Sequence, residues 1–300
     1  MRLLITGAVN RDEDFLLEIG KMGHSVIWMQ NESDELPVNY KDVDGVICNG
    51  LFLHHPIEKF ENLKYIQLTS AGYDRVPMEY IKANGIVIHN AHGVYSIPMA
   101  EYTLSCVLSV YNHSEYFRKN QSSHVWNKRR DIRELFGKRV CILGCGNVGT
   151  ACAMRFEAMG CEVIGVDISQ NKMQHYSRIY TIDELDTAIS QSDILIVTLP
   201  LTEKTKHILN YENLSLMPNG GIVVNIARGG VLCTDGLINM LTERPDVVAV
   251  LDVFEEEPLP PDHSLWDLPN VFLTPHNSFA GEGNICRLCK KIMLNLKNSE

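Results

Sequence analysis

Residues 140–156 read VCILGCGNVGTACAMRF, and they decide the fold because they join a strand pattern to a helix pattern through three glycines. The apolar run 140–143 predicts a buried strand, and residues 150–159 carry apolar side chains at helical spacing. In such a turn the first glycine permits a tight bend, the second lets a phosphate approach the backbone, and the third lets helix and strand pack closely. The N–H groups that open the helix suit an anion. The loop therefore predicts a dinucleotide site at Gly144, Gly146, Asn147, Val148 and Gly149.

A second strand pattern, residues 162–166, ends in Asp167. This acid lies about 20 residues beyond the first glycine, where dinucleotide-binding folds place the carboxylate that binds the adenosine ribose. A carboxylate there repels a 2′-phosphate, and residues 168–171 contain no arginine to hold one. The sequence therefore favours NAD over NADP. The alternative, a generic strand-turn-helix unit, is disfavoured once strand, glycines, helix and acid agree.

Short β-branched runs alternate with helical patterns along the whole chain, which indicates an α/β fold with parallel sheets and crossover helices. The first series of strands is expected at residues 3–6, 25–28, 45–48, 65–68 and 86–89. The second is expected at 140–143, 162–166, 194–198, 221–225, 247–251 and 271–274. One long helix is expected at about 98–117, with Ser96 as its N-cap, and a last helix at about 282–296. Because the last helix follows the second series, we expect a discontinuous domain of residues 1–96 plus 279–300 around a domain of residues 97–278.

Charge and composition exclude several classes of function. A net charge of −10 argues against a nucleic-acid partner, because neutralising phosphates requires a basic surface. No apolar run approaches the roughly 20 residues that span a bilayer, and residues 1–6 are too short for the core of a signal peptide. We therefore expect a cytoplasmic protein with no membrane partner, whose nine cysteines are mostly reduced. Neither the C-x-x-C at 286–289 nor the adjacent His54 and His55 predicts a metal site.

Candidates for chemistry follow the strands of the second series, because ligands of doubly wound sheets meet the carboxyl ends of the strands. Arg228, one of the acids 255–257, and His276 occupy such positions. An imidazolium can protonate a carbonyl oxygen as a hydride arrives, a carboxylate behind the ring stabilises its charged form, and an arginine can grip a carboxylate. Together they predict hydride transfer at a carbonyl beside a carboxylate. The residues alone do not choose among the three glutamates, and a surface arginine or a solvated acidic turn remain alternatives.

The chain resembles the D-isomer-specific 2-hydroxyacid dehydrogenases over nearly its whole length, in the manner of phosphoglycerate dehydrogenases and glyoxylate–hydroxypyruvate reductases. The resemblance rests on LTSAGYD at 68–74, MAE at 99–101, GCGNVG at 144–149, LPLT at 199–202, NIARG at 225–229, LDVFEEEP at 251–258 and PH at 275–276. It implies two Rossmann-like domains, of which residues 1–96 plus 279–300 bind substrate and residues 97–278 bind NAD. It also implies a homodimer.

The resemblance assigns roles to individual residues. Arg228 is similar to the family's substrate-binding arginine, His276 to its acid/base, and Glu257 to the carboxylate partner of that histidine. Asp252 resembles the residue that holds the nicotinamide carboxamide. The loop whose amides bind the substrate carboxylate is matched by Ser70, Ala71 and Gly72. Further cofactor contacts are implied at Leu199, Pro200, Thr205, Ala227, Arg228 and His276.

The implied reaction is the NAD-dependent interconversion of a small 2-oxoacid and a D-2-hydroxyacid. Residues 49–53, expected near the substrate's side chain, include no arginine or lysine, which disfavours a phosphorylated substrate, although Arg75 remains a candidate phosphate partner. Residues 277–279 differ from the small, glycine-containing stretch common in the family, and no regulatory extension is expected after the last helix. Formate oxidation is disfavoured because Glu257 is not a glutamine. A corepressor-like protein that senses NAD(H) on the same fold is the alternative.

Overall fold

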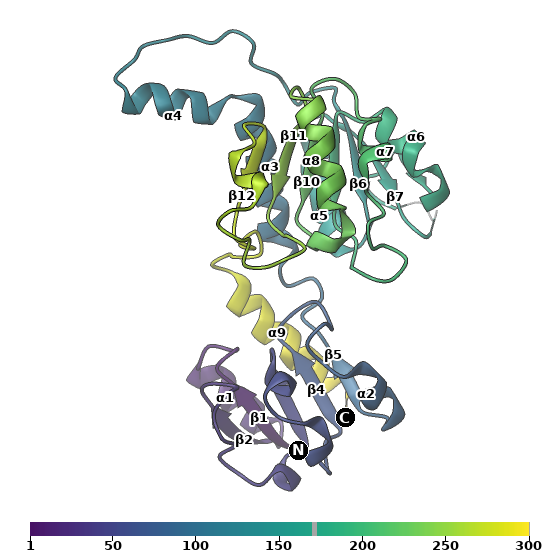
Figure 1. Ribbon diagram of the computed structural model, residues 1–300. Coiled ribbons are helices and arrows are strands. Elements are labelled where there is room, and N and C mark those ends of the chain that lie inside the picture. Colours follow the sequence, from purple (N-terminus) through teal and green to yellow (C-terminus); the bar gives the residue numbers. More distant parts are fainter. Residues whose placement is uncertain (170–172, 300) are drawn as a thin grey trace. The chain divides into compact units, whose positions relative to one another are not determined.

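The computed structural model describes residues 1–169 and 173–299. The chain forms two compact units: unit 1 is Met1–Tyr95 with Gly281–Glu300, and unit 2 is Ser96–Ala280 (Figure 1). Each unit is built on a parallel sheet, so the predicted α/β fold with two Rossmann-like domains, the first of them discontinuous, is confirmed. Gln170 and Asn171, part of the stretch that lacks an arginine, lie outside the described residues.

Unit 1 contains a five-stranded sheet in the order β2-β1-β3-β4-β5, an arrangement of doubly wound folds. Its strands are β1 (Arg2–Thr6), β2 (Ser25–Met29), β3 (Gly45–Cys48), β4 (Tyr65–Leu68) and β5 (Val87–His89). Its α-helices are α1 (Glu13–Lys21), α2 (Met78–Ala83) and α9 (Asn284–Lys297). Short 3-10 helices span Tyr40–Asp42, Leu51–Leu53 and Ile57–Lys59.

Helix α9 belongs to unit 1 because its apolar stripe completes that core. Leu288, Ile292 and Leu296 recur every fourth residue and are buried in one cluster with side chains of β1. A buried polar contact fixes the helix as well, since the Asn295 amide donates to Gln67 Oε1 at 2.8 Å. The chain thus returns to unit 1 after unit 2 is complete.

Unit 2 contains a seven-stranded sheet in the order β12-β11-β10-β9-β6-β7-β8. Its strands are β6 (Arg139–Leu143), β7 (Glu162–Val166), β8 (Arg178–Tyr180), β9 (Ile194–Val197), β10 (Ile222–Asn225), β11 (Val248–Leu251) and β12 (Val271–Leu273). Its α-helices are α3 (Ser96–Tyr111), α4 (Ser114–Ser122), α5 (Asn147–Ala158), α6 (Leu185–Ser190), α7 (Tyr211–Leu214) and α8 (Thr234–Glu243). Short 3-10 helices span Ile182–Glu184, Gly229–Val231 and Ser264–Asp267. The strand order reverses between β6 and β9, which is where such sheets bind a ligand.

Two local predictions are wrong. The expected long helix is two helices, α3 and α4, because His113 between them has a φ of 49°, which ends the helical ladder. Ser96 is itself helical and its buried hydroxyl has no hydrogen-bond partner among the described residues, so it is not a capping side chain. Strand β8 was not expected, because its only apolar residues, Ile179 and Tyr180, follow a polar stretch. Helix α4 and the segment after it project from the rest of unit 2 (Figure 1).

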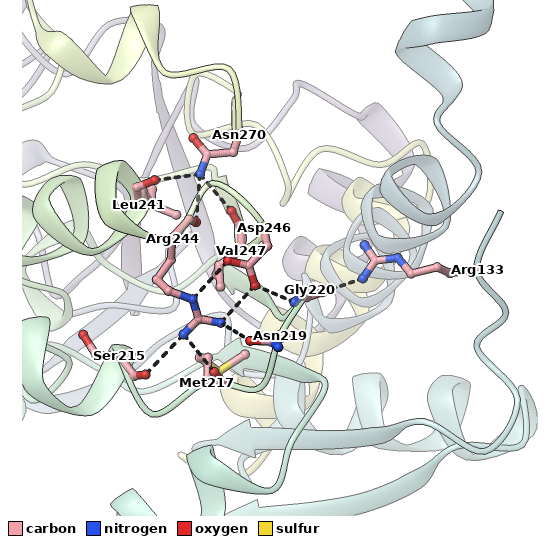
Figure 2. Close-up of polar contacts among 10 residues, drawn as sticks. All are labelled: Arg133, Ser215, Met217, Asn219, Gly220, Leu241, Arg244, Asp246, Val247 and Asn270. Atoms are coloured by element: carbon pink, nitrogen blue, oxygen red, sulfur yellow. Dashed lines mark hydrogen bonds and ion pairs between the residues drawn. The ribbon is translucent and has the colours of Figure 1, made fainter. Parts of the chain in front are cut away.

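Arg244 forms a cluster of hydrogen bonds at the edge of the unit 2 sheet where β10, β11 and β12 begin (Figure 2). Arg244 donates to both carboxylate oxygens of Asp246 at 3.0 and 2.9 Å, to Asn219 Oδ1, and to the carbonyls of Ser215 and Met217. Asp246 in turn accepts the Gly220 N–H at 2.8 Å. Ligands of such sheets bind at the opposite edge, where the strands end. This cluster therefore stabilises the fold and is not expected to contact a ligand.

Replacing Arg244 with alanine is expected to destabilise unit 2 by about 1–3 kcal/mol, a fall of several degrees in Tm, because the partly buried carbonyls of Ser215 and Met217 and the carboxylate of Asp246 lose their donor. The hydrogen bonds from Arg244 hold the pKa of Asp246 down at about 2, below its usual value, although partial burial opposes this. A lowered pKa means that the stabilisation is full above the unfolded pKa near 3.8 and is lost as pH falls toward 2. The Tm gap between wild type and variant should therefore narrow over that range in calorimetry. Lys21→Ala, which breaks an exposed ion pair with Glu18 in unit 1, is the control and should change Tm little at any pH.

Candidate active site

The glycine loop lies at the point where the unit 2 sheet reverses its strand order. Gly144 follows β6 with a φ of +101°, a left-handed conformation that favours glycine. A Cβ on Gly144 would lie 3.0 Å from the Leu199 nitrogen, just beyond β9. The Thr198 hydroxyl also donates to the Gly144 carbonyl at 2.6 Å, so the two loops that flank the reversal are fixed against each other.

The other two glycines of the motif have opposite surroundings. A Cβ on Gly149 would lie 2.1 Å from the Gly144 carbonyl oxygen, so this residue lets α5 pack closely on the turn. A Cβ on Gly146 would meet nothing within 4 Å. Gly146 is the N-cap of α5 and has no side chain to cap it, so the N–H groups of Asn147 and Val148 open the helix without an intrahelical acceptor. The loop therefore fits a pyrophosphate.

The acid that follows β7 is tied to the same loop. Asp167 Oδ2 accepts the Cys145 N–H at 2.7 Å, and the side chain is only partly buried. Its second oxygen, Oδ1, is 3.4 Å from the Ser169 nitrogen. Burial raises the pKa of the Cys145 thiol to about 12, so the loop contributes no second negative charge at neutral pH. The carboxylate of Asp167 could therefore accept hydrogen bonds from a ribose bound beside the glycine loop.

Residues after β9 form a loop closed by a threonine. Leu199 is buried, and Pro200 is exposed. The Thr205 hydroxyl donates to the Pro200 carbonyl at 2.6 Å and accepts the Thr202 N–H at 2.8 Å. Thr205 thus determines the shape of the rim beside the glycine loop.

Arg228 is presented by a turn that a buried asparagine builds. Asn225, the last residue of β10, accepts the Ala227 N–H and donates to the Arg228 carbonyl, both at 3.1 Å. Arg228 is partly buried, and its guanidinium donates to the Ala227 carbonyl at 2.7 Å. The role of Asn225 was not predicted, although an asparagine that ends an apolar strand pattern was the available signal.

The loop after β11 lies directly against this turn. A Cβ on Gly229 would lie 1.8 Å from the Phe254 carbonyl carbon, so only glycine allows the two backbones to meet. β10, β11 and β12 are neighbouring parallel strands, and therefore Arg228, Glu257 and His276 follow three adjacent strands at one edge.

The three glutamates at 255–257 have different surroundings. Glu255 accepts the Thr234 N–H at 2.8 Å and pairs with His207 Nε2 at 2.8 Å. Burial would raise the pKa of Glu255, but these hydrogen bonds lower it below its usual value. Glu257 accepts the Phe254 N–H at 3.0 Å and pairs through Oε2 with His276 Nδ1 at 2.8 Å. Glu256 is exposed. Glu257 is thus the glutamate that the structure pairs with His276.

His276 is held by its ring and by its backbone. Because the carboxylate can only accept, Nδ1–H donates to Glu257, which leaves Nε2 as the ring nitrogen able to exchange a proton. The backbone has a φ of 50°, and its N–H donates to the Asp252 carbonyl at 2.8 Å. The ring of Phe279 stands edge-on to the imidazole, with the ring centres 6.1 Å apart.

The carboxylate of Asp252 anchors the turn that carries His276. It is fully buried and accepts the N–H groups of Asn277 at 2.8 Å and Ser278 at 2.9 Å. The Thr274 hydroxyl donates to it at 2.6 Å and is itself 2.6 Å from the Tyr102 hydroxyl of α3. Sequence reasoning did not identify Thr274 and Tyr102 as supports, since neither belongs to a recognisable pattern.

Ser70, Ala71 and Gly72 lie in unit 1, directly after β4, whereas the other predicted site residues lie in unit 2. The loop is shaped by the Ser70 hydroxyl, which donates to the Gly72 carbonyl at 3.1 Å, and by the Asn90 amide, which donates to the Ala71 carbonyl at 2.6 Å. In the described part of the chain no acceptor is assigned to the N–H groups of Ala71 and Gly72. These two donors could receive a carboxylate.

The adjacent histidines have different surroundings, since His54 is exposed and His55 is buried. The buried ring of His55 is hydrogen-bonded to the Tyr40 hydroxyl at 2.9 Å and to the Glu32 carbonyl at 3.0 Å. Over residues 1–169 and 173–299, no three His, Cys, Asp or Glu side chains gather as metal ligands. Within those residues there is also no helix with the length and apolar character that crossing a membrane requires.

Comparison with known proteins identifies the family. Residues 104–278 match the model of the D-isomer specific 2-hydroxyacid dehydrogenase NAD-binding domain. The chain is 30% identical to D-3-phosphoglycerate dehydrogenase of Methanocaldococcus jannaschii over 94% of its own length, and it spans 54% of that protein. It is 32% identical to glyoxylate reductase of Thermofilum pendens, over 82% of this chain and 75% of that one. D-lactate dehydrogenase of Aquifex aeolicus, solved with NAD and lactic acid, superposes with a TM-score of 0.80 at 25% identity, covering 99% of this chain and 94% of the other. The chain therefore belongs to the family of NAD-dependent D-isomer-specific 2-hydroxyacid dehydrogenases.

Proposed function

We propose that this protein interconverts a small 2-oxoacid and the corresponding D-2-hydroxyacid with NAD(H). The observation that carries the proposal is the pairing of His276 with Glu257, one strand away from the Arg228 turn, at the ligand-binding edge of an NAD-binding unit. Related proteins are named glyoxylate reductase and D-3-phosphoglycerate dehydrogenase, which supports this class of substrate.

In the proposed mechanism each of these residues has a defined role. NADH, when bound, supplies the hydride that reduces the carbonyl carbon. The guanidinium of Arg228 binds the substrate's carboxylate and polarises its carbonyl, which lowers the barrier by stabilising developing negative charge. His276 gives the proton on Nε2 to the carbonyl oxygen and takes it back in the reverse direction. Glu257 fixes the ring through Nδ1 and stabilises the imidazolium. For unit 1 we propose separately that the N–H groups of Ala71 and Gly72 bind a substrate carboxylate.

A panel of 2-oxoacids tests this proposal directly. Glyoxylate, hydroxypyruvate and pyruvate should each be examined for oxidation of NADH, and the product's configuration determined by chiral chromatography. We expect turnover of at least one member, with a D-configured product where the product is chiral. Absence of turnover over a broad panel with both NADH and NADPH would reject the proposal.

We further propose that NAD is preferred to NADP. The carboxylate of Asp167, fixed to the glycine loop through Cys145, would lie beside a 2′-phosphate and repel it. Comparison of kcat/KM with NADH and NADPH measures the preference, and Asp167→Asn should reduce it by removing the charge. Equal use of both cofactors by the wild type would contradict the assignment.

The two glycines with opposite surroundings give a paired prediction. Gly146→Ala should leave stability within about 0.5 kcal/mol of wild type, because its methyl meets no protein atom, yet weaken NADH binding at least about tenfold by filling the pyrophosphate position. Gly149→Ala should destabilise by about 1–3 kcal/mol, because its methyl meets the Gly144 carbonyl. Thermal unfolding and NADH fluorescence titration measure both. Unchanged NADH affinity in Gly146→Ala would remove the loop from the cofactor site.

We also propose that the protein is a homodimer through the projecting segment of unit 2. A hollow of about 730 Å³ is lined by Phe117, Asn120, Gln121 and residues 124–130. Phe117, Val125 and Trp126 are exposed apolar side chains there, and Trp126 is 92% exposed. Exposed apolar clusters of this kind mark interaction surfaces, and a second copy is the partner that the family resemblance implies. Sedimentation should show a dimer for the wild type and a shift toward monomer for Trp126→Ser. A monomeric wild type would refute the proposal.

A further inference from the structure

A carboxylate fills the point where the unit 1 sheet reverses its strand order. In the order β2-β1-β3 this point lies beyond the carboxyl ends of β1 and β3, where doubly wound sheets bind ligands. Glu32 reaches it from the turn after β2. Its Oε1 accepts the Thr6 hydroxyl at 2.7 Å and the Asn49 N–H at 2.6 Å, and its Oε2 accepts the Gly50 N–H at 2.6 Å. The side chain therefore occupies donors that would otherwise suit an anionic ligand.

Glu32 is held in place by a buried histidine. Since the Glu32 carbonyl can only accept, His55 donates to it through Nε2, and His55 Nδ1 accepts the Tyr40 hydroxyl. The ring of Tyr40 packs edge-on against Phe60, with the ring centres 4.9 Å apart. The acid is thus fixed at its backbone and at both carboxylate oxygens, unlike a flexible surface glutamate.

The hydrogen-bond donors around the Glu32 carboxylate are all neutral. Two are backbone N–H groups and one is a hydroxyl, and within the described residues Glu32 forms no ion pair. Arg75 also borders this loop, since its Cδ is 3.7 Å from the position of a Cβ on Gly50, and it is exposed. A second anion at this loop would meet the negative charge of Glu32 and would find both N–H groups occupied.

This loop is next to the proposed carboxylate-binding loop. β3 and β4 are paired neighbours, and beyond their ends the Thr69 N–H donates to the Cys48 carbonyl at 2.9 Å. Residues 49–50 and 70–72 therefore leave the sheet side by side within unit 1. A substrate whose carboxylate lies on residues 70–72 has its remaining atoms within reach of the loop that Glu32 closes.

We propose that Glu32 is a positioning residue for specificity: it closes the residue 49–50 loop with an internal carboxylate and so selects 2-oxoacids whose side chain carries no negative charge. This proposal rests on the proposed function and narrows its substrate class. Hydroxypyruvate is accepted, whereas its 3-phosphate ester meets a like charge and no open N–H donor. Juxtaposed like charges of this kind cost enough to change a selectivity ratio by at least about tenfold.

The kinetic experiment compares hydroxypyruvate with 3-phosphohydroxypyruvate, which differ only in the phosphate. The wild type should prefer hydroxypyruvate at least about tenfold in kcat/KM, and Glu32→Gln should reduce that preference at least about tenfold, mainly by lowering KM for the ester. Glu32→Asp, which keeps the charge, should keep the wild-type preference. Glu35→Gln removes an exposed acid nearby and is the matched control, with no change expected.

A binding measurement gives a result that does not depend on turnover. Millimolar inorganic phosphate should raise the Tm of Glu32→Gln above its phosphate-free value and leave the wild type and Glu35→Gln unchanged. This result would support the inference even if no 2-oxoacid were reduced, in which case only the proposed function would fall. A wild type that reduces the ester as well as hydroxypyruvate, or a Glu32→Gln variant whose kcat/KM falls equally for both, would overturn it. If Glu32→Gln does not fold, the test is whether the wild type prefers hydroxypyruvate to its 3-phosphate ester and whether Glu32→Asp keeps that preference. Absence of either result would overturn the inference.

Discussion

Replacing His276 with glutamine is expected to lower kcat for 2-oxoacid reduction by about 10²–10⁴-fold, the usual contribution of a general acid. Glutamine can still donate a hydrogen bond to Glu257, but it cannot release a proton to the substrate oxygen. NADH affinity should change little, because the glycine loop and Asp167 are not in contact with this side chain. Asparagine is a useful second variant, since the φ of 50° at this position lies in the left-handed region that asparagine tolerates. Stopped-flow measurement of NADH oxidation gives kcat, and fluorescence titration gives the affinity.

The chain contains a matched control for this variant. His207 pairs with Glu255 at the same 2.8 Å, and the side-chain exposures are 39% and 35% for this pair against 42% and 36% for His276 and Glu257. His207→Gln therefore removes an equivalent ion pair without touching the proposed proton donor, and its kcat should remain close to that of wild type. If both variants lost activity equally, or if His276→Gln kept wild-type activity, the assignment of His276 would be wrong.

Replacing Gly229 with alanine is expected to abolish activity and to cost more than about 3 kcal/mol of stability. The added methyl would lie 1.8 Å from the Phe254 carbonyl carbon and 2.3 Å from the Glu255 nitrogen, and neither backbone atom can rotate away. The loop after β11 must then move, and it carries the partner of His276. Displacements of about 1 Å at such a site are enough to cost 10²-fold in rate. Chemical denaturation and steady-state kinetics on the same preparation measure both effects.

The next residue along the chain supplies the comparison. A Cβ on Gly230 would meet only the side chain of Leu201, 3.1 Å away, which can adjust. Gly230→Ala should therefore lose less than about 1 kcal/mol of stability. If the two variants lost similar amounts of stability and activity, the contact between Gly229 and the loop after β11 would not determine the geometry of the pair formed by Glu257 and His276.

The architecture could be predicted from the sequence because most strands are buried and consist of uninterrupted runs of apolar residues. β3, β4 and β7 have the predicted bounds, and the other predicted strands differ by a residue or so at an end. What failed was local. A left-handed conformation at His113 has no sequence pattern of its own, so the break between α3 and α4 could not be foreseen. Strand β8 has only two apolar residues, which is too few to distinguish it from a loop.

The site was predictable to the level of strand ends and no further. Because Arg228, an acid and His276 each follow a strand, the sequence predicted that they lie at one edge of the sheet. It did not distinguish Glu257 from Glu255, because the direction of consecutive side chains in a turn has no simple sequence pattern. Glu32 carried no signal at all. An acid shortly after a strand resembles any solvated surface residue until the ends of two neighbouring strands are seen to donate to it.

The return of α9 to unit 1 has a consequence for how the chain is made. Unit 2 is continuous and interrupts unit 1, so the segment that contains α9 is synthesised only after residues 96–280. Unit 1 begins first, yet it lacks Leu288, Ile292 and Leu296 of its core, and the partner of Gln67, until α9 has followed unit 2. Since domains usually fold in the order in which they are synthesised, this arrangement reverses that order: the unit that begins first can be completed only after the other has been made.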